Sequence, residues 1–150
     1  VKEDLSWLSN TIRPAELEEL QARATDNVAA QAAFTIQANN LATLNSTGVK
    51  IAFGTDGNSA WAPHVEMADM VAAGMTPHEV IVAATRNSAD LLGLSDVGSL
   101  ERGKSADFVV LEANPLDDIT NTRRISDVYL RGEVVDRGGL SANWIGVNAQ

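Results

Sequence analysis

The stretch that most constrains the fold is VKIAFGTDG at residues 49–57, where a short apolar run stops abruptly at an aspartate flanked by glycines. The run is too continuously apolar for a strand with one wet face, so it predicts a strand covered on both faces, as in a parallel α/β sheet. Gly54 and Gly57 allow the backbone to turn tightly around Asp56. The rest of the chain can be placed relative to this aspartate.

Asp56 has two interpretations at this point. In parallel α/β folds the functional groups lie beyond the carboxyl ends of the strands, and a buried carboxylate there needs a neutralising partner such as a cation. Alternatively, the aspartate caps the turn or helix that follows, as aspartates often do. The strand alone does not decide between a functional and a capping role.

Composition limits the classes of function. The chain has 150 residues, of which 45% are hydrophobic, so it can bury a core of one domain or two small ones. With 20 acidic against 11 basic residues the net charge is -9, which argues against a nucleic-acid partner and favours cations. The absence of cysteine leaves only Asp, Glu and His as metal ligands. No apolar run approaches the ~20 residues of a membrane span, so we expect a soluble protein, and the sequence leaves open whether it is cytoplasmic or periplasmic.

Helices are expected on both sides of the 49–57 stretch. Apolar residues recur every three to four positions between residues 28 and 44, which predicts a helix that Gly48 terminates. The sequence TPHE at 76–79 is a capping box with proline in the first turn, and it predicts another helix. Asn87 and Ser88 are expected to begin a short last piece of that helix. A helix that feeds a strand in this way is typical of a parallel sheet.

The pattern changes after residue 97 to short runs rich in β-forming residues, namely DFVVL at 107–111, ISDVYL at 125–130 and EVVD at 133–136. Arg131 and Gly132 predict a tight turn between the last two runs. We therefore expect two parts, residues 1–93 and residues 94–150, the second being a separate β layer.

Residues 98–105, GSLERGKS, formally match the P-loop pattern G-x-x-x-x-G-K-[ST]. A P-loop needs a buried strand before it and a helix after it, whereas here a strand is predicted directly after Ser105. A β-turn over residues 101–104 is the better interpretation, and nucleotide binding is the weaker hypothesis.

The two histidines both follow Asp56. His64 lies eight residues later, at the start of the next helix, so both side chains could open onto the same loop. The alternative for His64 is a half-buried packing or capping role. His78 lies in the first turn of a polar helix end and is expected to be solvated. We find no arrangement of Ser, His and Asp that suggests a nucleophilic triad.

Taken together, these motifs resemble the C-terminal portion of the amidohydrolase superfamily, metal-dependent hydrolases built on a (β/α)₈ TIM barrel. The matching parts are IAFGTDG at the end of barrel strand eight, HVEMADMVAAGMTPHEVIVAATRNSADLLGL over the following helices, and GSLERGKSADFVVLEANPLDDI with ISDVYLRGEVVD in a flanking β-sandwich. The branch that looks most similar is that of imidazolonepropionase-like and Xaa-Pro dipeptidase-like enzymes. The resemblance implies an α/β fold, with the last part of the barrel at residues 1–93 and the β-sandwich portion at residues 94–150.

The resemblance also implies a site. Asp56 would be the catalytic and metal-binding aspartate at the end of strand eight, and His64 would lie at the substrate mouth. The implied cofactor is a divalent metal, zinc in type, with one or two ions. However, the chain has no His-x-His motif and no metal-bridging lysine, and a catalytic zinc needs about three protein ligands. We therefore expect the other ligands outside this chain.

The function expected from the resemblance is hydrolysis of an amide or other non-aromatic C–N bond, in a dipeptide or a cyclic amide, by metal-activated water. A complete barrel takes ~250 residues, so we expect the chain to be a fragment whose natural N-terminus lies upstream of Val1 and which is inactive alone. Its partners would be the substrate and the missing N-terminal part of the barrel, and a homo-oligomer remains open. The alternative is a non-catalytic remnant that serves as a binding or assembly module. An upstream His-x-His motif would favour the enzyme.

Overall fold

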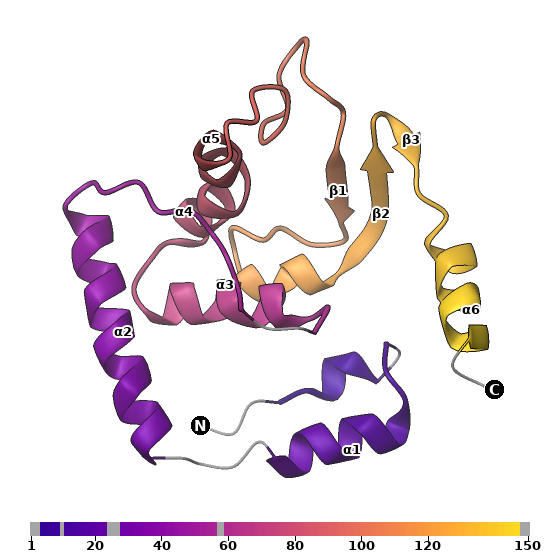
Figure 1. The fold of residues 1–150 in the computed structure, drawn as a ribbon, viewed down its shortest axis with the longest axis horizontal. Coiled ribbons are helices and arrows are strands. Elements are labelled where there is room, and N and C mark those ends of the chain that lie inside the picture. Colours follow the sequence, from indigo (N-terminus) through magenta and orange to yellow (C-terminus); the bar gives the residue numbers. More distant parts are fainter. Residues whose placement is uncertain (1–3, 10, 24–27, 57–58, 148–150) are drawn as a thin grey trace. The chain divides into compact units, whose positions relative to one another are not determined.

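The computed structural model describes residues 4–9, 11–23, 28–56 and 59–147 (Figure 1). It divides into two compact units, residues 1–37 and residues 38–150. The division expected at residue 93 refers to the parts of a larger enzyme and stays a prediction.

The first unit contains the 3₁₀ turn η1 (Ser6–Leu8), the helix α1 (Pro14–Arg23) and the beginning of α2 (Val28–Ser46). Pro14 opens α1 because its fixed φ suits the first turn of a helix, where its missing N–H is not needed. Leu8 is fully buried, and its carbonyl accepts hydrogen bonds from the amides of Thr11 and Ile12. Leu8 thus closes the turn that leads toward α1.

The C-terminal end of α2 is closed by the glycine that the sequence analysis identified. Gly48 has φ of +80°, and the amides of Gly48 and Val49 donate to the carbonyls of Asn45 and Leu44 at 3.0 and 3.2 Å. This pair of bonds is a Schellman motif, which needs a left-handed residue that glycine adopts without strain. The expected helix end is confirmed.

The helices of the second unit are α3 (Ala62–Ala72), α4 (Pro77–Val82) and α5 (Ser88–Leu91), with the π-helical turn η2 (Ala83–Asn87) between the last two. The capping box is confirmed: the amide of Glu79 donates to Oγ1 of Thr76, and the amide of Thr76 donates to Oε2 of Glu79. The core of this unit consists of Met67, Met70, Met75, Val80, Ala83 and Ile119, so half of these residues are methionines.

The expected strand at residues 49–53 is not formed within the described part of the chain. Residues 49–56 lie outside any helix or strand, although Ile51 and Phe53 pack against the core. A parallel strand acquires its conformation from neighbours on its edges, and the described residues provide no such neighbour. Residues 49–53 thus have the apolar composition of a buried strand but do not pair with another strand among the described residues.

The β layer is a three-stranded antiparallel sheet in the order β1 (Phe108–Leu111), β2 (Ile125–Leu130) and β3 (Glu133–Val134). Arg131 and Gly132 both have positive φ, 54° and 83°, as a two-residue hairpin turn requires. The expected β runs and their turn are therefore confirmed. The described residues form this single sheet, so the β-sandwich stays a prediction.

The last helix, α6 (Arg137–Val147), was not expected from the sequence. The signal was Asp136, whose Oδ1 accepts the amide of Gly139 at 2.9 Å, as an N-cap residue does. The two glycines that follow obscured this signal because glycine has low helix propensity. In the part of the chain that the structure describes, no helix is both long and apolar enough to cross a membrane.

Candidate functional site

Asp56 lies at the end of an apolar segment that is fixed to the helices of the second unit. Phe53 donates its amide to the Ala83 carbonyl at 3.1 Å, and the Ile51 carbonyl accepts from Nδ2 of Asn87 at 2.7 Å. Beyond Phe53 the residues up to Asp56 are exposed. The structure thus presents the Asp56 carboxylate to solvent at the end of an anchored backbone.

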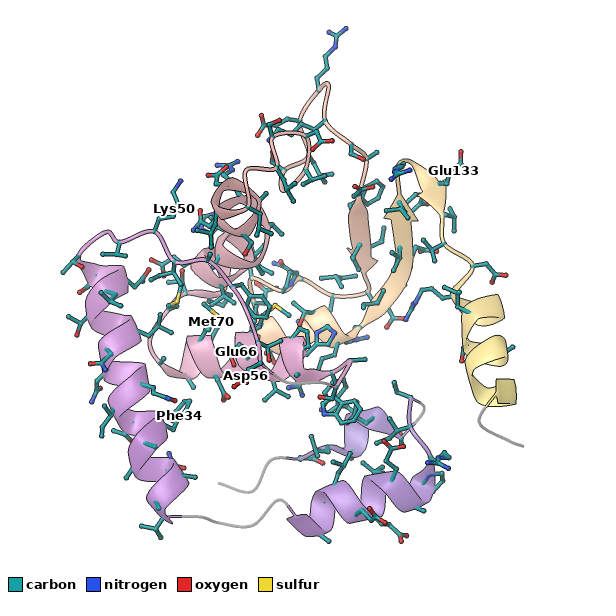
Figure 2. All side chains as sticks on the ribbon, in the orientation of Figure 1. Phe34, Lys50, Asp56, Glu66, Met70 and Glu133 are labelled. Carbon is teal, nitrogen blue, oxygen red and sulfur yellow. The ribbon has the colours of Figure 1, made fainter. Side chains whose placement is uncertain are left out.

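Glu66 of α3 lies beside Asp56 (Figure 2), and Asp69 follows Glu66 three residues later on the same face of the helix. The pKa of Glu66 is raised, first by partial burial and then by the negative charges of Asp69 and Asp56. Burial also raises the pKa of Asp69. Raised carboxyl pKa values mean that this part of the surface favours a proton or a cation over further negative charge.

His64, in the first turn of α3, is half-buried and contacts the 3₁₀ turn η3 (Ile119–Arg123). Its Nδ1 lies 3.1 Å from Oγ1 of Thr122, and that hydroxyl donates to the carbonyl of Ile119 at 2.8 Å. A hydroxyl has one proton, so His64 Nδ1 must be the donor in its contact with Thr122. Burial, and then the positive charge of Arg123, lower the pKa of His64. Both effects favour the neutral imidazole, and the hydrogen bond from Thr122 to Ile119 favours a proton on Nδ1.

The structure places an acidic residue beside Asp56 and a hydroxyl group beside His64. The charge of Asp56 acts on Glu66, whereas His64 is oriented by Thr122. The predicted roles of Asp56 as catalytic and metal-binding residue and of His64 as substrate-binding residue stay predictions.

The acidic residues of this site do not form a metal centre by themselves. Among the described residues, no group of three His, Cys, Asp or Glu side chains is placed to hold a metal ion. A zinc ion needs about three protein ligands. The donor set of the described residues alone therefore does not fit a resident zinc.

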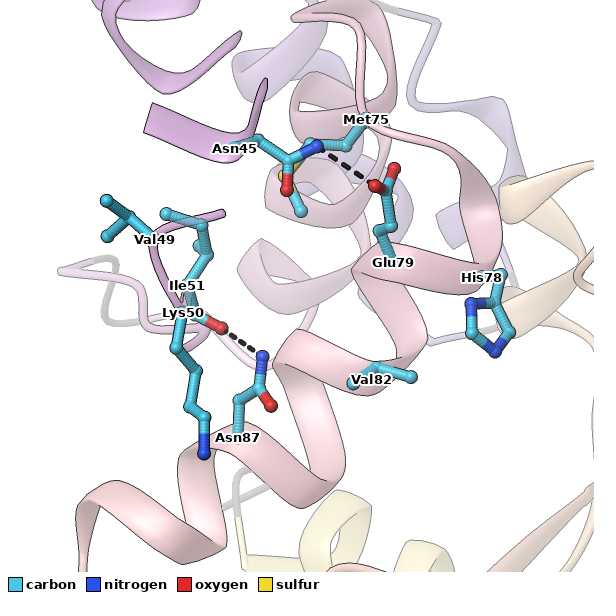
Figure 3. A pocket seen from close by; sticks show the side chains of 9 residues that line it. All are labelled: Asn45, Val49, Lys50, Ile51, Met75, His78, Glu79, Val82 and Asn87. Atoms are coloured by element: carbon cyan, nitrogen blue, oxygen red, sulfur yellow. Dashed lines mark hydrogen bonds between the residues drawn. The ribbon is translucent and has the colours of Figure 1, made fainter. Parts of the chain in front are cut away.

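A cavity of about 130 Å³ lies at the opposite end of the anchored segment (Figure 3). Its lining residues are Asn45, Val49, Lys50, Ile51, Met75, His78, Glu79, Val82 and Asn87. Neither Asp56 nor His64 is among them, so the cavity is separate from the site described above. His78 is exposed, as expected.

The P-loop hypothesis is not supported by the conformation of its residues. The amide of Lys104 donates to the carbonyl of Glu101 at 3.1 Å, which is the expected β-turn. The strand β1 begins four residues later, where a P-loop requires a helix. Lys104 thus has a structural position in the turn before the sheet.

Sequence reasoning missed several residues around the site. Glu66 and Asp69 could have been found, because residues three apart share one face of a helix and both closely follow His64. Thr122 and Arg123 had no local signal, since their effect on His64 acts across almost 60 positions.

The comparisons with known proteins identify the family. The model of the amidohydrolase family matches residues 1–135, and this chain therefore belongs to that family. An imidazolonepropionase of Deinococcus radiodurans is 37% identical over 97 residues, which cover 59% of this chain and 24% of that protein. A 5-methylthioadenosine/S-adenosylhomocysteine deaminase of Teredinibacter turnerae is 33% identical over 137 residues, covering 72% of this chain and 31% of that protein.

The solved structure of a Xaa-Pro dipeptidase with bound methionine is also similar, with a TM-score of 0.63 and 28% identity. The match covers 87% of this chain and 30% of that structure. The expected resemblance is thus confirmed, and the fold is a mixed α/β structure that matches part of an amidohydrolase barrel. The described residues do not close a barrel. The chain spans about a quarter to a third of the length of these relatives.

Proposed function

We propose that this chain is the C-terminal portion of a hydrolase that cleaves an amide or other non-aromatic C–N bond, with dipeptides and cyclic amides as substrate classes. The observation that carries the proposal is the exposed Asp56 carboxylate at the end of an anchored segment, in a chain that matches the amidohydrolase family over residues 1–135. The relatives include a dipeptidase and an imidazolonepropionase.

In this proposal Asp56 moves a proton. Its carboxylate accepts the proton of the attacking water and then delivers it to the leaving nitrogen, so that one group serves both steps. A divalent metal of the zinc type, one or two ions, would supply Lewis acidity when bound, with its remaining ligands outside this chain. The carboxylates of Glu66 and Asp69 would add negative potential beside it.

His64 has a supporting role in the proposal. Its side chain is half-buried in the first turn of α3, the helix that follows Asp56, and lies 3.1 Å from Oγ1 of Thr122. His64 thus comes from the helix after the loop and not from the end of the anchored segment, where the proposed metal-binding residue lies. We therefore assign His64 to substrate binding rather than to metal binding.

The test is an assay of the complete enzyme that contains this chain, loaded with zinc, on a panel of dipeptides and cyclic amides. We expect turnover, and we expect Asp56→Asn to lower kcat by about 10²–10⁴-fold because the amide cannot transfer the proton. Asp90→Asn is the matched control, since Asp90 is exposed and pairs with Lys50 at 3.0 Å. Turnover retained by Asp56→Asn would refute the role of Asp56. Substrate binding without any turnover would favour the non-catalytic remnant.

A further inference from the structure

The short helix α5 begins at Ser88 with Asn87 before it, as expected from the sequence, but it continues directly from the π turn η2. Both residues have right-handed helical φ and ψ, and Asn87 makes no capping hydrogen bond. Their side chains instead reach across to the segment before Asp56. Nδ2 of Asn87 donates to the Ile51 carbonyl at 2.7 Å, and Oγ of Ser88 accepts the Phe53 amide at 3.1 Å.

The π-helical turn η2 explains how this contact is made. A π turn uses one residue more than an α turn, which widens the helix locally and changes which groups point outward. At the first residue of η2 the Ala83 carbonyl accepts both the Phe53 amide at 3.1 Å and the Ser88 hydroxyl at 2.8 Å. Ala83 is fully buried, so these bonds lie against the core.

The result is a two-point attachment of the apolar segment. Ile51 is held through its carbonyl and Phe53 through its amide, and the Ser88 oxygen also lies 3.3 Å from the Phe53 carbonyl. Asp56 follows only three residues after the last attached amide, a distance of at most ~10 Å along an extended chain. The residues from Gly54 to Asp56 are exposed, so the segment leaves the core at Phe53.

We propose that Asn87 and Ser88 are positioning residues: they attach residues 51–53 to the π turn of the helix and so set where the Asp56 carboxylate stands. The step from attachment to catalysis rests on the proposed function, whereas the attachment itself does not. Thr85 lies in the same turn and serves as the comparison residue. Its hydroxyl donates to the Ile81 carbonyl of its own helix at 2.7 Å and makes no such link to the segment.

Hydrogen exchange in the complete enzyme tests the attachment without using activity. In Ser88→Ala and Asn87→Ala we expect amides of residues 51–56 to exchange about tenfold faster, the effect of losing one hydrogen bond. The exchange rates of the amides of residues 77–82 should stay within about twofold of those in the unaltered enzyme, because the helix keeps its own hydrogen bonds. Ser88→Thr should restore slow exchange because it retains the hydroxyl, and Thr85→Ala should match the unaltered enzyme.

Kinetics test the second step. In the same variants we expect kcat to fall about tenfold with KM within about twofold, because a displaced Asp56 weakens the chemical step more than substrate binding. Unchanged exchange at residues 51–56 would overturn the attachment. Faster exchange with unchanged kcat, or equally faster exchange in residues 77–82, would overturn the positioning role. If the unaltered enzyme hydrolysed nothing, the proposed function would fail, while exchange would still decide the attachment.

Discussion

His64 donates a hydrogen bond from Nδ1 to Oγ1 of Thr122, 3.1 Å away and 58 positions later in the chain. The contact joins the first turn of α3 to η3, and it fixes the proton of the imidazole because the Thr122 hydroxyl is committed to Ile119. Thr122 therefore favours one orientation and one tautomer of the histidine.

This arrangement predicts a pH dependence of stability. The pKa of His64 is lowered by burial and by Arg123, so below about pH 6.5 the unfolded chain binds more protons than the folded chain. The contribution of neutral His64 to the free energy of unfolding is fully present above the pKa of His64 in the unfolded state. It is lost as the pH falls toward the lower pKa of His64 in the folded state. The free energy of unfolding, measured with urea, should therefore depend less steeply on pH in His64→Gln than in the unaltered protein below about pH 6.5. An unchanged slope would contradict the assigned neutral state.

The carboxylates of α3 change the stability with pH in the opposite direction. The raised pKa of Glu66, due first to burial and then to Asp69 and Asp56, means that its contribution is present at low pH and lost as the pH rises through the raised value. Glu66→Gln should therefore stabilise the protein at pH 7, by about 0.5 kcal/mol or less because water screens a partly exposed group. Glu112→Gln, in an exposed pair with Arg124, is the control that should give no gain. Thermal melts at pH 7 measure both.

His64→Ala in the complete enzyme should lower kcat/KM while bound zinc stays unchanged, because His64 is assigned to substrate and not to metal. His78→Ala is the matched control, since His78 is exposed and should affect neither quantity. Metal content and kinetics are measured on the same preparation. Loss of zinc in His64→Ala would make this histidine a ligand and refute the assignment.

Gly98→Ala should destabilise the second unit strongly. Gly98 has φ of +84°, and a Cβ there would lie 2.6 Å from Cβ of Ala89 and 3.1 Å from the Thr85 carbonyl oxygen. Gly103→Ala is the control, because Gly103 has φ of +91° but nothing within 4 Å. We expect about 1–2 kcal/mol of backbone strain in the control and about 1–3 kcal/mol more in Gly98→Ala from the clash. If chemical denaturation showed the same loss of unfolding free energy in Gly98→Ala and Gly103→Ala, the residues packed around Gly98 would be able to move apart without cost.

Residues 1–150 expressed alone should show no metal-dependent hydrolysis and should aggregate or fold loosely. Within the described sheet Val109, Leu130 and Val134 are 50%, 56% and 60% exposed, and the apolar 49–53 segment has no strand neighbour. Apolar strands of this kind associate with other chains. Sedimentation, zinc titration and the substrate panel check the expectation. A monodisperse protein that binds zinc tightly and turns over any substrate would contradict it.

The features that the sequence predicted well are those set by neighbouring residues. Gly48 ends α2 through bonds to the preceding turn, the box at residues 76–79 caps α4, and Arg131 with Gly132 makes the hairpin turn. Each depends on groups within five positions of one another. Asp56 could be singled out for the same reason, because an aspartate between glycines after an apolar run is a local pattern.

The features that failed depend on distant partners. The 49–53 segment reads as a strand, but strand pairing is a property of neighbours that the described chain does not provide. The short helix that begins at Ser88 was expected, but the bonds of Asn87 and Ser88 to the segment span 36 and 35 positions and had no local signal. The contact of His64 with Thr122 spans 58 positions of the sequence. Residue type fixes which bonds a side chain can make, while the fold selects its partner.

The hydrogen bond from Asn45 Nδ2 to Glu79 Oε1, 3.1 Å long, ties the last turn of α2 to the first turn of α4. Residues 28–37 of the same helix belong to the other unit, where Val28 and Ile36 are 85% and 63% exposed. The two halves of this helix thus belong to different units, and the bond to Glu79 holds the second half. Chymotrypsin should cut it at Phe34 before it reaches the last two turns, and the larger fragment should keep its helix end through Glu79.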